Sequence, residues 1–157
     1  TFWPGRLEIC SDDPFILLDG AHNVQGCIAL AETLEQILPG QKLVFLTGML
    51  ADKNTKAMLK EILAGRNYAI DTVFATEPPS SRKHAAETLA EQIREINDSR
   101  LESLPKDSYN MRIVALAKAD DAAGQARQYA RDRELPLIAF GSLYLVGEIR
   151  PLLRGKE

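Results

Sequence analysis

Apolar residues in this chain form two patterns that alternate along its length. Short continuous apolar runs are typical of strands buried on both faces of a parallel sheet, and a strict polar–apolar alternation is typical of a strand with one exposed face. The alternation occurs at residues 6–10, which predicts a strand with one exposed face. The continuous runs predict five further strands at residues 15–18, 43–48, 71–76, 112–116 and 135–141.

Between the strands, apolar residues recur at three- and four-residue spacing, which indicates amphipathic helices. A last helix is expected from Ser142 onward, and Pro39-Gly40 ends the first helix. The polar, proline-containing stretch 97–110 is interpreted as a connection. The segments with this helical spacing of apolar residues are 27–38, 58–63, 86–96 and 122–130.

Strands that alternate with helices of crossover length favour an α/β fold. We expect a Rossmann-like, mostly parallel sheet of about six strands, with helices on both faces. The length of 157 residues fits one domain covering residues 1–157. The first residues, Thr1 to Arg6, include neither an initiator Met nor a signal peptide, so we expect a piece of a longer protein.

Composition narrows the classes of function. The hydrophobic share of 45% and the charged share of 26% are those of an ordinary soluble protein. A net charge of -3 argues against non-specific nucleic-acid binding, and no apolar run is long enough to span a membrane. Cys10 and Cys27 lack a CxxC arrangement, which argues against a metal site and for reduced, buried thiols in the cytoplasm.

Polar side chains follow several of the predicted strands directly. Because the carboxyl ends of parallel strands share one edge of a sheet, these residues should converge there and form a site for a polar ligand. Asp, Asn and Ser are also common in turns and helix caps, and that role stays open for Asp52, Asn54 and Ser142. The converging residues are Asp19, His22, Asn23, Asp52, Lys53, Glu77, Arg82, Ser142 and Tyr144.

No motif among these residues specifies a reaction. The chain lacks the GxxxxGK[ST] and GxGxxG phosphate loops. Gly141-Ser142-Leu143-Tyr144 does not form a GxSxG elbow, so a serine hydrolase is not expected. His22 is a candidate hydrogen-bonding residue, and His84 is expected at the surface. The residues alone therefore indicate a nucleotide- or small-molecule-binding domain.

Four ordered segments carry a resemblance to a known family. Leu18-Asp19-Gly20-Ala21-His22-Asn23 resembles the D-G-A-H-N signature of the folylpolyglutamate synthases and dihydrofolate synthases, within the Mur ligase superfamily. Residues 3–8 resemble the family's W-P-G-R-x-E segment, residues 48–53 its G-x-x-x-D-K strand end, and residues 141–148 its G-S-L-Y-x-x-G-E segment. On this resemblance, a bacterial bifunctional enzyme is the first expectation within the family.

The resemblance implies the C-terminal domain of an ATP-dependent ligase. Such enzymes convert a carboxylate of dihydropteroate or a folate into an acyl phosphate with ATP, and the amine of L-glutamate then displaces phosphate. The phosphate loop and the Mg²⁺ ligands belong to an N-terminal ATPase domain of the same polypeptide. The resemblance therefore implies no catalytic residue in this domain, and the isolated domain should be inactive.

Residue roles also follow from the resemblance. Arg6 is expected to contact the nucleotide phosphates and Asp19 the ribose hydroxyls. His22 and Ser142 are expected to hold the incoming glutamate. Tyr144 is expected to assist them, with core packing as its alternative.

The resemblance also concerns two further cationic residues, and the chain departs from the family pattern at two positions. Lys53 and Arg82 are candidate anion contacts, with a solvated surface charge as the alternative for each. Val24 stands where many members have proline, and Asn54 where they often have aspartate, so a charged role for that position is doubtful. A non-catalytic ligand-binding module, or the C-terminal domain of another Mur-type amino-acid ligase, remains the alternative function.

Overall fold

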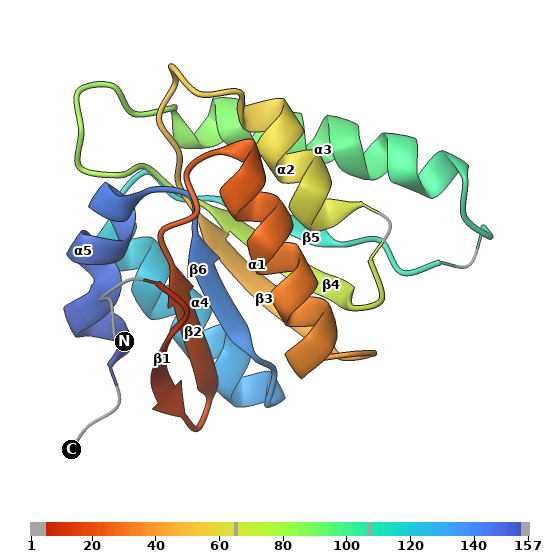
Figure 1. Cartoon of the computed structure of the whole chain (residues 1–157), viewed down its shortest axis with the longest axis horizontal. Coiled ribbons are helices and arrows are strands. Elements are labelled where there is room, and N and C mark those ends of the chain that lie inside the picture. The colour runs from red at the N-terminus through yellow and green to blue at the C-terminus, as the bar shows by residue number, and fades with distance from the viewer. Residues whose placement is uncertain (1–5, 65, 107, 155–157) are drawn as a thin grey trace.

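The computed structural model describes residues 6–64, 66–106 and 108–154, and its strands and helices alternate along the chain (Figure 1). The strands are β1 (Glu8–Asp12), β2 (Phe15–Asp19), β3 (Lys42–Thr47), β4 (Ala69–Ala75), β5 (Arg112–Ala115) and β6 (Leu137–Phe140). The helices are α1 (Val24–Ile37), α2 (Thr55–Leu63), α3 (Ala86–Glu102), α4 (Ala119–Arg133) and α5 (Leu143–Leu153).

The strands form one sheet in the order β1-β2-β6-β3-β4-β5. Among these six strands, the β1–β2 pair is antiparallel and the other neighbouring pairs run parallel. The prediction of a mostly parallel, Rossmann-like sheet is therefore confirmed. The shared direction brings the carboxyl ends of β2, β6, β3 and β4 to one edge, where α1 and α5 begin (Figure 1).

Helices cover both faces of the sheet, as predicted. One apolar core joins a sheet face to α1, α2 and α3, and a second joins the other face to α4 and α5. Figure 1 shows α1 in front of the sheet and α4 behind it. The buried face of α4 consists of alanines, namely Ala119, Ala122, Ala123, Ala126 and Ala130. Such small side chains let a helix lie close to the strands it covers.

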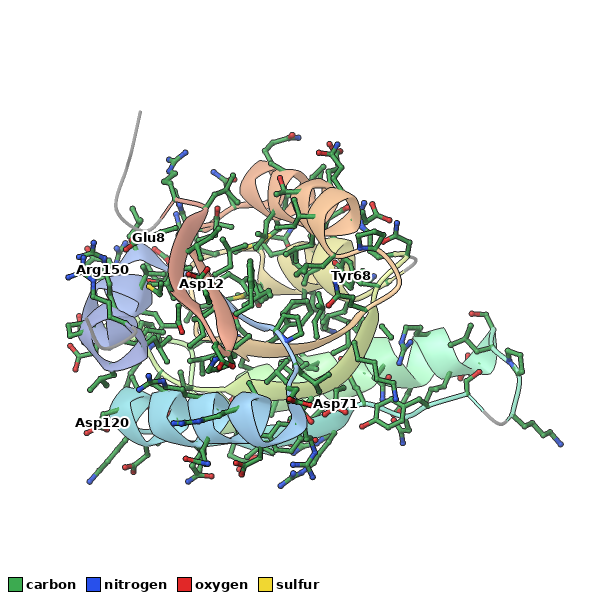
Figure 2. All side chains as sticks on the ribbon, turned by 90° about the horizontal axis from the view of Figure 1, so that it is seen from below. Glu8, Asp12, Tyr68, Asp71, Asp120 and Arg150 are labelled. Atoms are coloured by element: carbon green, nitrogen blue, oxygen red, sulfur yellow. The ribbon has the colours of Figure 1, made fainter. Side chains whose placement is uncertain are left out.

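The edge strand β1 departs from the usual polar-out pattern. Ile9 is 57% exposed, whereas Glu8 is only 6% exposed. Both carboxylate oxygens of Glu8 lie 2.9 Å from Nε of Arg150 on α5 (Figure 2). A charge that is removed from water needs a partner of this kind. The ion pair therefore fastens β1 to α5.

Helix α3 is longer than the sequence indicates. Residues 97–102 belong to the helix, so the prediction of a connection from Asn97 was wrong for this part. Asn97 is buried, and its Nδ2 donates to Oδ1 of Asn110 at 2.6 Å. Because this tertiary hydrogen bond satisfies a polar side chain inside the helix, the apolar stripe gives no sign of the extension.

Candidate functional site

The turn after β2 is organised by the carboxylate of Asp19. The backbone N–H of Ala21 donates to its Oδ1 at 2.7 Å, and the backbone N–H of Leu7 donates to its Oδ2 at 3.2 Å. Burial raises the pKa of Asp19, although these two N–H donors act in the opposite direction. Through these hydrogen bonds, Asp19 keeps the segment that contains Arg6 next to the turn.

His22 is oriented by the same turn. Its Nδ1 lies 2.9 Å from the carbonyl oxygen of Gly20. Because a carbonyl only accepts hydrogen bonds, Nδ1 must carry the proton, and in the neutral ring Nε2 is then left as an acceptor. Asn23 caps α1 by accepting from the N–H of Gly26 at 2.7 Å. The Asp-Gly-Ala-His-Asn segment thus combines a structural cap with one half-buried, oriented imidazole.

A cavity of about 380 Å³ opens beside this turn. Arg6, Asp19 and His22 line it, together with the first turns of α1 from Asn23 to Ala29. The N–H groups at the start of a helix favour anions, and the guanidinium of Arg6 adds a positive charge nearby. Trp3-Pro4-Gly5, the rest of the motif that contains Arg6, lies outside the described residues.

A smaller cavity of about 140 Å³ adjoins the first, and His22 lines both. Three loops that are distant in sequence meet there, as the convergence of strand ends predicts. The loop after β3 contributes Leu50 and Lys53, and the loop after β4 contributes Arg82. The turn after β6 contributes residues 141–144.

Ser142 and Tyr144 differ in how they face this smaller cavity. Ser142 is 2% exposed, and its Oγ caps α5 by accepting from the N–H of Tyr144 at 3.1 Å. Tyr144 is 51% exposed, so the core-packing alternative is wrong for this residue. The capping role considered for Ser142 is confirmed, and it fixes the position of the hydroxyl at the cavity wall.

The two cations of the smaller cavity have different environments. Nη1 of Arg82 pairs with Oδ2 of Asp52 at 2.9 Å, and both side chains are about half exposed. Lys53 is exposed and forms no ion pair within the part of the chain that the structure describes. Asn54 caps α2 by accepting from the N–H of Ala57 at 3.3 Å, which explains why a neutral side chain serves there.

The loop from residues 77 to 85 folds back onto the loop after β3. The N–H of His84 donates to the carbonyl of Met49 at 2.8 Å, and the N–H of Ala51 donates to that of Arg82 at 2.8 Å. His84 is consequently only 8% exposed, and its prediction as a surface residue was wrong. The same contacts bring Arg82 to the cavity.

Glu77 does not line either cavity. Its Oε2 accepts from the N–H of Ala86 at 3.0 Å, and its Oε1 pairs with Nζ of Lys83 at 2.8 Å. These two contacts, the Ala86 N–H first, lower the pKa of Glu77. Its place after a strand is thus explained by helix capping.

Apolar walls of the two cavities were missed in the sequence. Leu7 lines the larger cavity, and Leu50 and Leu143 line the smaller one. Leu50 and Leu143 come shortly after predicted strand ends, and this position in the sequence could have identified them as residues of the site. Within the described ranges no helix is long and apolar enough to cross a membrane, and no group of three or more His, Cys, Asp or Glu side chains is placed to hold a metal ion.

Comparisons with known proteins agree on one family. Residues 5–140 match the family described as "Mur ligase, glutamate ligase domain". The chain is 33% identical over 155 residues to the folylpolyglutamate synthase of Lacticaseibacillus casei, covering 99% of this chain and 31% of that protein. It is 29% identical over 157 residues to the dihydrofolate synthase/folylpolyglutamate synthase of Bacillus subtilis, covering 97% of this chain and 31% of that protein.

Solved structures give the same result for the fold. A folylpolyglutamate synthase from Mycobacterium tuberculosis, complexed with ADP and AMPPCP, superposes with a TM-score of 0.79 at 26% identity, over 100% of this chain and 33% of that one. A bifunctional folylpolyglutamate synthase/dihydrofolate synthase from Yersinia pestis, complexed with AMPPNP and a Mn ion, gives 0.74 at 26% identity, over 97% of this chain and 32% of that one. The chain spans about a third of the length of these relatives.

Proposed function

This chain belongs to the family of the Mur ligase, glutamate ligase domain, and we propose that it orients ATP and L-glutamate within a larger ATP-dependent ligase. The ligase would add L-glutamate to dihydropteroate, to folyl (poly)glutamates, or to both, through an acyl phosphate. An N-terminal ATPase domain of the same polypeptide would supply the phosphate loop and most of the Mg²⁺ ligands. We place the enzyme in the cytoplasm, because Cys10 and Cys27 are both free thiols.

The observation that carries this proposal is the pair of adjoining cavities that share His22. A ligase of this kind must hold a nucleotide and an amine next to each other, because the amine attacks a carboxylate that the nucleotide has activated. The larger cavity suits the nucleotide, and the smaller one suits glutamate. Relatives that were solved with ADP, AMPPCP or AMPPNP bind nucleotides, which supports a nucleotide as a ligand of the larger enzyme.

In the larger cavity, we assign the nucleotide phosphates to Arg6 and the ribose hydroxyls to Asp19. A guanidinium offers several donors in a fixed plane, which suits phosphate oxygens. Both oxygens of Asp19 already accept one backbone N–H, but each carboxylate oxygen has a second lone pair. The Leu7 hydrogen bond would keep Arg6 at the cavity whenever Asp19 is in place.

In the smaller cavity, we assign the amine of glutamate to His22 and its carboxylates to Ser142, Lys53 and Arg82. In the neutral ring, Nε2 of His22 is an acceptor and therefore suits an N–H donor. Hydroxyl and cationic groups suit carboxylate oxygens. Tyr144 would close the exposed side of the cavity. These groups align and neutralise the reactants, and none of them would form a bond to the substrate.

The proposal is tested by reciprocal kinetics in the full-length enzyme that contains this chain. His22→Ala should raise the KM for L-glutamate about tenfold or more and leave the KM for ATP within twofold, because it removes one charge-assisted contact. Arg6→Ala should raise the KM for ATP by a similar factor and spare glutamate. If both substitutions changed the two KM values equally, the assignment of one ligand to each cavity would be wrong.

A further inference from the structure

A third cavity lies between α2 and α3, and it shares no lining residue with the two cavities at the strand ends. Its volume of about 460 Å³ is within the usual range for small-molecule sites. Lys56 and Lys60 are four residues apart and therefore lie on one face of α2. Ser99, Arg100 and Ser103 face them from the last turns of α3.

The charges in this groove do not balance. Among the described residues, Lys56, Lys60 and Arg100 line it with Glu95 as the one acid, and Glu95 pairs with Lys56 at 2.9 Å. Lys60 and Arg100 form no ion pair with any residue in the described ranges. Both side chains lie in the last turns of their helices, whose C-terminal ends offset part of the positive charge. Two cations without a carboxylate partner among the described residues therefore remain on opposite walls, and such an arrangement attracts anions.

Arg100 is held in place by amides in the absence of a carboxylate. Its Nη2 donates to Oδ1 of Asn97 at 2.8 Å, and Asn97 in turn donates to Asn110 at 2.6 Å. Asn97 is 3% exposed, so this support is rigid. A neutral amide orients the guanidinium without cancelling its charge.

The environment of Arg100 is costly without an anion. Its Nε is buried and has no acceptor among the described residues. Burial alone lowers the pKa of Arg100, but the guanidinium stays charged at neutral pH. A partly buried cation without a counter-charge destabilises the fold unless something compensates for it.

We propose that the groove between α2 and α3 binds a small, multiply charged oxyanion, either a phosphoryl compound or a polycarboxylate. Nη1 of Arg100, which makes no hydrogen bond within the described ranges, and the ammonium of Lys60 would contact its oxygens, and Ser99 would donate a hydrogen bond. The site lies outside the proposed ligase cleft. It does not depend on the function proposed above.

Two-dimensional NMR of the whole 157-residue chain at low ionic strength tests the proposal, with inorganic tripolyphosphate and citrate as separate probes. Saturable shifts of resonances in residues 56–64 and 95–103 are expected with at least one of the two probes. A response to tripolyphosphate alone would identify a phosphoryl site, and a response to citrate would identify a polycarboxylate site. Shifts confined to the turn at residues 19–23 would overturn the proposal, as would titrations that do not saturate with either probe.

Substitutions then distinguish a specific binding site from non-specific attraction of anions to positive charge. Arg100→Met should weaken binding at least tenfold, and Lys60→Met should weaken it several-fold. Arg94→Met is the matched control, because Arg94 is an exposed cation on the same helix outside the groove, and it should change binding less than twofold. Lys60 is exposed, so its variant gives a result even if Arg100→Met does not fold. Equal weakening by Lys60→Met and Arg94→Met would overturn the proposal.

Discussion

Gly141 joins β6 to α5 in a conformation that side chains oppose. Its φ is 120°, and an added Cβ would lie 2.6 Å from the carbonyl oxygen of Gly48 and 2.7 Å from Oγ1 of Thr47. Both the backbone strain and the contact with a rigid backbone oxygen are unfavourable. Gly141→Ala should therefore lower the free energy of unfolding by about 2 kcal/mol or more, measured by urea denaturation.

Gly124 provides the matched control for Gly141→Ala. It lies in α4, and a Cβ added there would meet no atom within 4 Å. Gly124→Ala should raise the free energy of unfolding by about 0.5–1 kcal/mol, because alanine has less conformational freedom to lose and favours a helix. Equal effects at the two positions would show that local geometry at Gly141 does not control the turn.

At the scale of single residues, the sequence predicted that several polar side chains meet at one edge of the sheet and left their contacts open, and it included Glu77, which lines neither cavity. The convergence of Asp19, His22 and Ser142 follows from the parallel sheet alone. The pairing of Arg82 with Asp52 and the burial of His84 require two loops to fold onto each other. No local pattern encodes that contact, because it depends on hydrogen bonds between the loops after β3 and β4.

At the scale of elements, the start of α3 depends on a residue from outside the helix. Ala85 at the cap position offers no side-chain acceptor, and Glu77 supplies one to the N–H of Ala86. Glu77→Gln keeps an acceptor oxygen and removes the charge that favours a helix N-terminus and Lys83. At pH 7 this variant should be less stable than the wild type by about 1 kcal/mol.

The pH dependence of that difference follows from the lowered pKa of Glu77. The unfolded chain binds the proton more readily than the folded chain, so the contribution is complete above the unfolded pKa of about 4.3 and is lost as the pH falls through the lower folded value. Urea denaturation at pH 7 and near pH 3 should show the difference closing. Glu87→Gln, an exposed position in the same turn, should show a change within about 0.5 kcal/mol at both pH values.

Two features that the sequence did not predict, the length of α3 and the inward orientation of Glu8, share a physical cause. Residues 97–102 of α3 lack an apolar stripe that continues the first turns, and the buried Asn97 relies on Asn110 for a partner. In β1, Glu8 faces inward because Arg150 lies opposite. Both cases depend on a polar pair formed by residues distant in sequence, which hydrophobic periodicity does not report.

At the scale of the whole molecule, the alternating pattern predicted the architecture, and the four ordered motifs predicted the family. Both predictions are confirmed. The groove between α2 and α3 was not predicted, because Lys56, Lys60 and Arg100 have the spacing of any solvated helix face. The lack of a carboxylate partner for Lys60 and Arg100 among the described residues becomes visible only once the two helices lie side by side.

The division of labour between domains gives the last prediction. We propose that both cavities bind and orient ligands, whereas the chain has no phosphate loop to bind a triphosphate. The isolated chain should therefore bind ATP only weakly, with a Kd above about 100 μM by calorimetry, and should not ligate glutamate to a folate in an ADP-release assay. The full-length enzyme, assayed alongside, should be active. Ligation by the isolated chain would place the activating chemistry within these 157 residues and would contradict the assignment of its side chains to binding and orientation alone.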